Sequence, residues 1–423
     1  MHEALLQYIW KNQLISQNIY KACTGESVEI VHPGKQNSDG GPDFTEARIK
    51  LNNTLWVGNI EIHVRSSEWH EHHHQNNPAY NNVILHVVYE NDKPCFNASG
   101  RRIPSISLQI EPRIHENYTA LIQNNSVIRC SNVLPGVDKQ LIYFWLNTLS
   151  VERLEEKTHA ITSLYRATKN SWEEAFYIHL ARSFGLKVNT LPFELLAKSL
   201  PLSVVAKHAD NLLQLEALFF GQSGLLPTNS TDEYTAGLTA EYNFLRKKYL
   251  LTPIAPELWK FLRMRPGNFP SLRIAQFTAL IHRSTKLFSR SMHASTLDEL
   301  LDLFDCRVSE YWKNRYNFSQ TVQKGATGQL GKSSRILLIL NTVIPFMFAF
   351  GSHTNNDTCR ETAVCLLEEI PAESNRKVND WKKLGIACRH AADSQALLQL
   401  TNCYCEPVNC LKCSIGHQFI TNN

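Results

Sequence analysis

The feature that most limits how this chain can fold is a change of sequence texture near residue 139. Before it lie short segments rich in β-branched or aromatic residues and separated by Gly, Pro, Asn and Asp, at 27–31, 44–51, 55–64 and 82–89. After it apolar residues recur at spacings of three and four, and strand-like segments disappear. We therefore predict an α/β N-terminal domain with a mixed sheet and flanking helices, followed by an all-α C-terminal domain.

The domain boundaries are predicted from the same patterns. Helical spacing indicates a first helix within residues 1–22, and a further extended segment at 103–110 closes an α/β domain over residues 1–130. An all-helical domain is expected over 131–400, before a cysteine-rich tail at 401–423. Its helices are predicted near 139–158, 172–185, 203–220, 235–250, 271–285, 296–316, 334–350, 357–370 and 376–400.

Composition and hydropathy exclude several classes of protein. With 43% hydrophobic and 19% charged residues, the chain has the composition of an ordinary globular protein. The N-terminus lacks the basic and apolar regions of a secretory signal, so a cytoplasmic location is expected. The apolar stretch 336–350 is shorter than the roughly 20 residues of a membrane span and contains Asn341 and Pro345, which favours a buried core helix and no membrane. The net charge of +4 permits nucleic acid as a partner without indicating it.

The main candidate for chemistry is a strand that ends in Glu61-Ile62-His63 and is preceded by Gly41-Pro42-Asp43-Phe44. Because successive side chains of a strand point to opposite faces, Glu61 and His63 share one face. Asp43 can add a second carboxylate from the start of a neighbouring strand, and paired carboxylates suit a hard divalent cation. The sequence therefore predicts a metal site at Asp43 and Glu61.

The pairing of these two strands leaves two possibilities open. A two-residue turn at 52–53 turns Asp43 away from the face of Glu61. A three-residue loop, or a bulge near Pro42, brings the two acids back together. The apolar pattern favours the tight turn, in which Glu46 shares the face of Glu61, so Glu46 is kept as a substitute ligand.

Histidines are concentrated after this strand, where six of the 17 fall within residues 63–86. The favoured interpretation is that His72 or His74 lies in the same cleft as Glu61 and contacts phosphate or metal. His86 alternates with apolar residues and is interpreted as a strand histidine whose hydrogen bonds are satisfied.

The same stretch contains a zinc-hydrolase pattern. His70, Glu71 and His74 satisfy H-E-x-x-H, in which two histidines one helical turn apart bind zinc and the glutamate acts as base. The pattern requires a helix through all three residues, and Asn76-Asn77-Pro78 follow almost at once. A zinc hydrolase is therefore kept as a minor alternative.

Four cysteines near the C-terminus, Cys403, Cys405, Cys410 and Cys413, follow the pattern C-x-C-x4-C-x2-C. Four thiolates can hold a tetrahedral zinc ion or an iron–sulfur cluster, and a C-x2-C pair is a common ligand knuckle. Because a large chain without an export signal is expected to keep its thiols reduced, we predict a metal site that pins the tail.

A basic loop lies within the helical half, where Arg263, Arg265 and Arg273 surround Pro266-Gly267-Asn268. A solvated loop between two helices is the more common outcome for such a segment. The alternative is a loop that contacts phosphate groups of a substrate, for which Arg265 is the candidate residue.

Taken in chain order, the first helix, the acid before the second strand and Glu-x-His on the third strand resemble the core of the PD-(D/E)XK nucleases. The resemblance implies a restriction-endonuclease-like fold in which acids hold magnesium and activate water for phosphodiester cleavage. Glu3 matches the helix acid, Asp43 the strand acid and Glu61 the acid of the Glu-x-Lys strand. His63 stands where those nucleases have lysine, which leaves its role as base or ligand open.

Short segments spread from end to end carry a second resemblance. They include residues 8–11 (YIWK), 41–44 (GPDF), 58–63 (GNIEIH), 83–89 (VILHVVY), 265–270 (RPGNFP), 341–346 (NTVIPF), 393–397 (DSQAL) and the terminal Cys405, Cys410 and Cys413. With these segments the whole chain resembles DUF2851, an uncharacterised bacterial family known as a domain of unknown function. Because that family implies no activity, a functional hypothesis has to rest on the residues.

The leading hypothesis is a magnesium- or manganese-dependent phosphodiesterase acting on DNA or RNA, with Glu3, Asp43, Glu61 and His63 as the catalytic set. The second is a non-catalytic scaffold with a degenerate nuclease core that binds nucleic acid or another protein, which the missing lysine suggests. The third is the zinc hydrolase.

Overall fold

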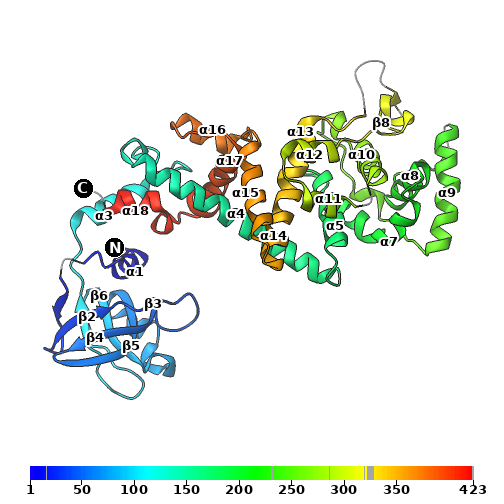
Figure 1. The fold of residues 1–423 in the computed structure, drawn as a ribbon. Helices are drawn as coiled ribbons and strands as arrows, with labels where there is room; N and C mark the ends of the chain where they lie inside the picture. The colour runs from blue at the N-terminus through cyan, green and yellow to red at the C-terminus, as the bar shows by residue number, and fades with distance from the viewer. Residues whose placement is uncertain (16, 230–231, 285, 319, 322–327, 422–423) are drawn as a thin grey trace. The chain divides into compact units, whose positions relative to one another are not determined.

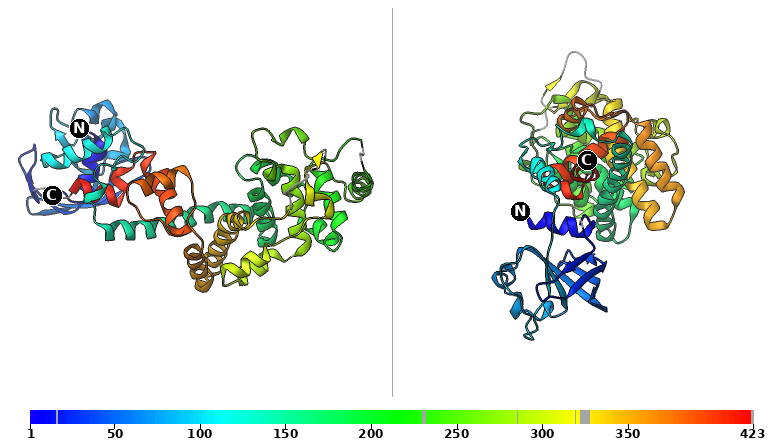
Figure 2. Two further views of the ribbon diagram at one scale, coloured as in Figure 1. Left: turned by 90° about the horizontal axis from the view of Figure 1, so that it is seen from above. Right: turned by 90° about the vertical axis from the view of Figure 1, so that its left-hand side faces the viewer.

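The computed structural model describes residues 1–15, 17–229, 232–284, 286–318, 320–321 and 328–421, and it divides into two compact units (Figure 1). The first unit combines residues 1–145 with 400–423, and the second comprises 146–399. The sequence predicted a separate tail at 401–423. These residues fold instead as part of the first unit, where α18 (Ser414–Thr421) packs against α3 (Pro112–Gln123) (Figures 1 and 2).

A mixed seven-stranded sheet forms the centre of the first unit. Its strand order is β1-β2-β4-β5-β6-β7, with β3 beside β4; the strands from β1 to β5 pair antiparallel, and β5, β6 and β7 pair parallel. The strands are β1 (Ile19–Lys21), β2 (Ser27–His32), β3 (Lys35–Gln36), β4 (Phe44–Leu51), β5 (Thr54–Arg65), β6 (Val83–Glu90) and β7 (Ser105–Ser107). The four strands predicted between 27 and 89 are confirmed, whereas the one expected at 103–110 shrinks to three residues.

Helix α1 (Glu3–Lys11) is shorter than the helix predicted within residues 1–22. Gln13 has a left-handed φ of 52°, so the chain leaves the helix and continues as the edge strand β1. Leu6 and Trp10 pack into the core beneath the sheet. The other buried side of α1 packs with apolar residues of α3 and α18, so the helix is fixed on two faces.

In the described part of the second unit, the regular elements are helices apart from the short pair β8 (Arg315–Asn317) and β9 (Gln320–Thr321). The division between the units falls within α4 (Lys139–Ala167). The other helices are α5 (Trp172–Phe184), α6 (Thr190–Ser199), α7 (Leu202–Val205), α8 (Leu212–Gln222), α9 (Glu233–Tyr249), α10 (Pro270–Arg283), α11 (Leu287–His293), α12 (Leu297–Leu303), α13 (Lys332–Leu338), α14 (Ile344–Thr354), α15 (Asp357–Glu369), α16 (Arg376–Lys383) and α17 (Ala391–Gln399).

Three of the predicted helices are shorter or interrupted. The segment 203–220 is divided because the side chain of Asn211 caps a new helix, α8. The segment 376–400 breaks at Gly385, whose φ of 83° ends α16. The segment 296–316 is helical only over α12 at its start.

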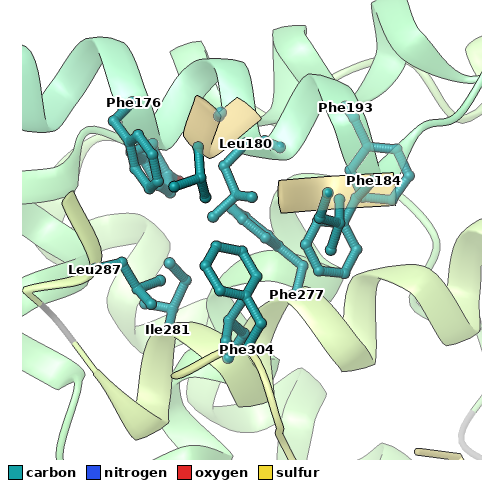
Figure 3. Close-up of a cluster of buried hydrophobic side chains, with 14 of the residues drawn as sticks. Phe176, Leu180, Phe184, Phe193, Phe277, Ile281, Leu287 and Phe304 are labelled. Carbon is teal, nitrogen blue, oxygen red and sulfur yellow. The ribbon is translucent and has the colours of Figure 1, made fainter. Parts of the chain in front are cut away.

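Aromatic side chains dominate the core of the helical unit. Phe184 from α5 lies near Phe277 from α10, with ring centroids 5.2 Å apart (Figure 3). Phe176 from α5 contacts Phe346 from α14, with ring centroids 5.2 Å apart. Within the described residues one helical stretch, Lys332–Thr354, is long and apolar enough to cross a membrane. However, 67% of its most apolar part is buried inside the protein. This burial agrees with the buried core helix predicted at 336–350.

Candidate functional site

Three carboxyl groups meet where α1 lies against β5. Glu3 and Gln7 are one helical turn apart, and Gln7 Nε2 donates hydrogen bonds to Glu3 Oε1 at 3.2 Å and to Asp43 Oδ1 at 2.9 Å. The backbone N–H of Asp43 donates to Glu61 Oε2 at 3.0 Å, and the N–H of Ile62 donates to Asp43 Oδ2 at 3.0 Å. The structure thus brings the predicted acids Glu3, Asp43 and Glu61 into one connected cluster.

A bulge in β4 makes this convergence possible. The hairpin turn between β4 and β5 is tight, as the apolar pattern favoured. Residues 45–46 together oppose a single residue of β5, so Phe44 pairs with Ile60 and not with Glu61. Asp43 therefore stays on the face of Glu61 even though the turn is tight.

Glu46, the substitute ligand expected from straight pairing, is not part of the cluster. It occupies the bulge with a left-handed φ of 57°, and its exposed carboxylate lies 2.7 Å from Lys35 Nζ. The expectation was wrong because it assumed one residue opposite one residue along the whole ladder. Alternation of apolar and polar residues does not reveal a bulge that lies on the polar side of the pattern.

Burial changes the ionisation of the three acids. It raises the pKa of Glu61 to about 8, and together with the charge of Glu61 it raises the pKa of Asp43 to about 7. Burial and the neighbouring Asp43 also raise the pKa of Glu3. Among the described residues, no lysine or arginine forms an ion pair with Asp43 or Glu61. Histidines are therefore the basic side chains that lie within ion-pair distance of this cluster among the described residues.

Three histidines lie together beside Glu61, and two of them contact its second oxygen. His63 comes from β5, whereas His72 and His74 come from the connection between β5 and β6. His63 Nε2 lies 3.5 Å and His74 Nε2 3.2 Å from Glu61 Oε1, and His72 Nδ1 lies 3.2 Å from His63 Nε2. His72 is exposed, while His63 and His74 are buried. Of the two candidate loop histidines, His74 therefore contacts Glu61, and His72 joins the cluster through His63.

Neighbouring rings hold these histidines in place. His86 on β6 is fully buried, and its Nε2 lies 2.9 Å from His63 Nδ1. The ring of Tyr80 stacks on His74 with centroids 3.8 Å apart, and Trp69 meets the same ring at a steep angle. Burial lowers the pKa of His63 to about 2 and that of His86 to about 3, so both rings are neutral.

Sequence reasoning missed two residues of this site, Gln7 and Tyr80. Gln7 could have been found, because it lies one helical turn after Glu3 and must share its face. Tyr80 carries no such local signal, since its contact with His74 depends on how the connection between β5 and β6 folds.

The H-E-x-x-H pattern has no structural counterpart. Helix α2 (Glu68–Glu71) ends before His74, and His73 adopts a left-handed φ of 59°. His70 Nε2 lies 3.0 Å from the carbonyl oxygen of Pro94. The zinc-hydrolase alternative is excluded because no single helix carries its three residues.

Arg265 belongs to the second unit, where it is exposed just before the 3₁₀ helix η6 (Pro266–Asn268). Arg273 of the same basic loop is instead buried. Its guanidinium donates to Asn268 Oδ1 at 2.6 Å and to Ser334 Oγ at 3.2 Å. Arg273 thus fixes the loop, and Arg265 remains available to solvent.

The structure brings together a different set of four cysteines from the one that the sequence pattern predicted. Cys405, Cys410 and Cys413 line a small cavity of the first unit together with Cys130, whereas Cys403 is not among the lining residues. None of these five is joined in a disulfide.

Fold and site together define a protein of two units, one built on a mixed sheet with a buried carboxylate and histidine cluster and the other helical. The chain belongs to the family described as a protein of unknown function, DUF2851, whose sequence model matches residues 3–376. The match includes the acids and histidines described above and ends before the C-terminal cysteines. No curated protein and no solved structure gave a match.

Proposed function

We propose that this protein is a metal-dependent phosphodiesterase that cleaves DNA or RNA, with Glu3, Asp43, Glu61 and His63 as its catalytic set. The observation that carries the proposal is the meeting of Asp43 and Glu61, joined by a hydrogen bond of 3.0 Å, beside the helix acid Glu3. One helix acid and two strand acids are the arrangement that the resemblance to PD-(D/E)XK nucleases implies. The mixed sheet with α1 against β5 is compatible with that fold.

The donor set at Asp43 and Glu61 fits magnesium or manganese. Carboxylate oxygens are the ligands that hard divalent cations prefer. The raised pKa values of both acids mean that burial leaves their negative charges without a counter-charge, which a cation would supply. When bound, such an ion lowers the pKa of water and stabilises negative charge on phosphate oxygens.

The protein's own groups would orient the attacking water. Neutral His63 Nε2 lies 3.5 Å from Glu61 Oε1, so a hydrogen-bond acceptor for that water stands beside the carboxylate. A neutral ring does not provide the positive charge of the lysine found in the nucleases, and a pKa of about 2 makes it a weak base, which favours the role of ligand over that of base for His63. The exposed His72 lies at the rim, where it can contact a phosphate group.

A cavity of about 640 Å³ in the first unit provides room for nucleotides. Its wall includes Gln7, whose amide also contacts Asp43, and the lysines Lys11 and Lys412. Lysines in such a wall suit a phosphate backbone. We propose the same phosphate-contacting role for exposed Arg265 of the helical unit, with a cytoplasmic nucleic acid as partner.

A non-catalytic scaffold with a degenerate nuclease core is the second candidate, and the neutral state of His63 favours it. In this case the same surfaces would bind nucleic acid or protein without turnover.

The test uses purified full-length protein, first treated with a chelator and then supplied with magnesium or manganese. We expect cleavage of duplex DNA, single-stranded DNA or RNA, and a loss of at least about a hundredfold in Asp43→Asn and Glu61→Gln. Glu46→Gln is the matched control, because this exposed acid lies on β4 close to Asp43 but pairs with Lys35 outside the cluster. Binding of all three substrates without cleavage favours the scaffold, and cleavage that survives both substitutions excludes this site.

A further inference from the structure

We propose that Glu61, His63, His72 and His74 form a four-ligand site for a transition-metal ion of the zinc type. The site shares Glu61 and His63 with the proposed catalytic set but takes a metal of another class, and its catalytic meaning rests on the proposed function. Metal binding itself is measurable without any cleavage.

The three histidines give the site its spacing. Ligands about 2.0–2.1 Å from one zinc ion lie about 3.3–3.4 Å from one another. His63 Nε2 lies 3.2 Å from His72 Nδ1, and the ligand atoms of His63, His72 and His74 are all within 4.8 Å of one another. Glu61 Oε1 lies 3.2 Å from His74 Nε2 and 3.5 Å from His63 Nε2, on the side of these two ligands. An ion held by the three histidines therefore gains Glu61 as its fourth ligand when His72 and Glu61 move toward it.

A buried nitrogen without a hydrogen bond points to a ligand at the same place. His74 is only 8% exposed, and its Nε2 faces Glu61 Oε1 without forming a hydrogen bond. A buried polar atom in this state costs free energy unless another group occupies it. Coordination of an ion by His74 Nε2 removes that cost.

Surrounding residues orient the ligands as metal sites require. The contact of 2.9 Å between His63 Nδ1 and His86 Nε2 leaves His63 Nε2 directed at the other ligands. Histidines that bind metals usually have their second nitrogen held by a hydrogen bond in this way. The stacked ring of Tyr80 fixes His74. His86 is therefore a positioning residue of the site.

The donor types decide the class of metal. Magnesium takes oxygen ligands and retains water, so three imidazole nitrogens argue against it. Imidazole suits zinc and neighbouring first-row metals. The set also differs from H-E-x-x-H, because it uses His63 and His72 and leaves out His70 and Glu71.

The experiment titrates chelator-treated full-length protein with zinc, cobalt and magnesium by calorimetry and visible absorption. We expect zinc to bind more tightly than magnesium, and cobalt to give the intense visible bands of tetrahedral coordination. His72→Ala should weaken zinc binding at this site at least tenfold, and the exposed His72 makes an unfolded variant unexpected. His73→Asn is the matched control, since His73 is exposed in the same loop and asparagine tolerates its left-handed φ.

Three outcomes separate this inference from the proposed function. In the first, zinc binds tightly to the wild type and weakly to His72→Ala while no nucleic acid is cleaved. This outcome supports the zinc site and excludes the proposed nuclease activity. Cleavage with magnesium, in a protein that binds zinc no more tightly than magnesium, supports the nuclease and excludes the zinc site. Zinc binding that is equal in wild type, His72→Ala and His74→Gln also overturns the inference.

A separate cavity carries a second inference. We infer that Cys130, and not Cys403, completes the C-terminal cysteine site, so that Cys130, Cys405, Cys410 and Cys413 hold one structural zinc ion. These four residues line a cavity of about 20 Å³, which is close to the volume that one water-sized sphere occupies. A single ion fits this volume better than an iron–sulfur cluster.

The surroundings of the cavity resemble a thiolate knuckle. Gly416 is needed there, because a Cβ at this position would lie 2.2 Å from the carbonyl oxygen of Cys410. Among the described residues only the three histidines already have ligand atoms within 4.8 Å of one another, so the sulfurs must draw together around the ion.

The test compares Cys130→Ser with Cys403→Ser in the full chain by elemental analysis and by the ultraviolet bands of cobalt bound to thiolate. We expect Cys130→Ser to lose one equivalent of zinc and Cys403→Ser to keep it. The reverse result, retention in both variants, or the absorption of an iron–sulfur cluster in the wild type overturns the inference. Because histidine ligands give no thiolate bands, this readout is independent of the first site.

Discussion

Asp43 faces Glu61 across β4 and β5, and its backbone N–H donates to Glu61 Oε2 at 3.0 Å. The contact exists because residues 45–46 together oppose one residue of β5. With straight pairing from the same tight turn, the two carboxyl groups would lie on opposite faces of the sheet. One extra residue in β4 therefore decides whether the candidate site exists.

Two changes of chain length test this dependence on register. Deletion of Glu46 removes the extra residue, so the ladder pairs straight from the turn and Asp43 stays opposite Glu61; cleavage should persist. Insertion of one alanine between Asp43 and Phe44 leaves Phe44 opposite Ile60 but moves Asp43 to the other face, so cleavage should fall to the level of Asp43→Asn. Full activity in the insertion variant would contradict the role of the register.

The backbone at Glu46 is predicted to prefer glycine. Its φ of 57° is unfavourable for most side chains and most unfavourable for β-branched ones. Glu46→Gly should leave the melting temperature unchanged or raise it, whereas Glu46→Val should lower it by about 2–4 °C. Differential scanning calorimetry checks both values. Equal melting temperatures for the two variants would show that residue 46 does not keep its left-handed backbone conformation in solution.

Substitution of Gly58 in β5 by any larger residue is predicted to destabilise the sheet. A Cβ there would lie 2.4 Å from Ile84 Cγ2 and 2.7 Å from the carbonyl oxygen of Asn82. Gly58→Ala should lower the free energy of unfolding by about 1–3 kcal/mol, because β5 and β6 would have to separate. Urea denaturation measures the change, and Gly237→Ala is the control at a position with no atoms within 4 Å.

Stability of the metal-free protein should depend on pH through Glu61. The pKa of this acid rises from 4.5 to about 8 on folding, so its contribution to stability is present below pH 4.5 and is lost as the pH rises through about 8. Relative to wild type, Glu61→Gln should therefore gain on the order of 2–4 kcal/mol between about pH 5 and pH 9. Denaturation in the presence of a chelator tests this. A constant difference across that range would contradict the raised pKa.

The proposed nucleic-acid contacts make a prediction about salt. Lys412 lines the cavity beside α1, and Arg265 is exposed in the helical unit. If both contact phosphates, Lys412→Ala and Arg265→Ala should each weaken binding of all sequences alike and reduce the slope of log affinity against log salt by about 1. Fluorescence anisotropy at several salt concentrations gives the slopes. If the slope of a variant equals that of the wild type, the substituted residue does not contact phosphate groups of the nucleic acid.

Much of the site can be predicted from single segments of the sequence. Alternation along β5 places Glu61 and His63 on the face opposite Ile60 and Ile62, which are buried in the sheet core. The tight turn is also predictable, because it follows from local apolar pairing. The error at Glu46 arose where pairing between strands, rather than pattern within one strand, decided the outcome.

The sequence by itself determined which segments become strands or helices and which faces of them are polar, because periodicity and capping act over a few neighbouring residues. Only the tertiary structure decided that Asp43 meets Glu61, that two loop histidines join His63 in one cluster, and that Cys130 rather than Cys403 lies with the last cysteines. The physical reason is that a bulge, a crossover connection and the docking of a distant segment are selected by packing between parts of the chain that no local pattern links.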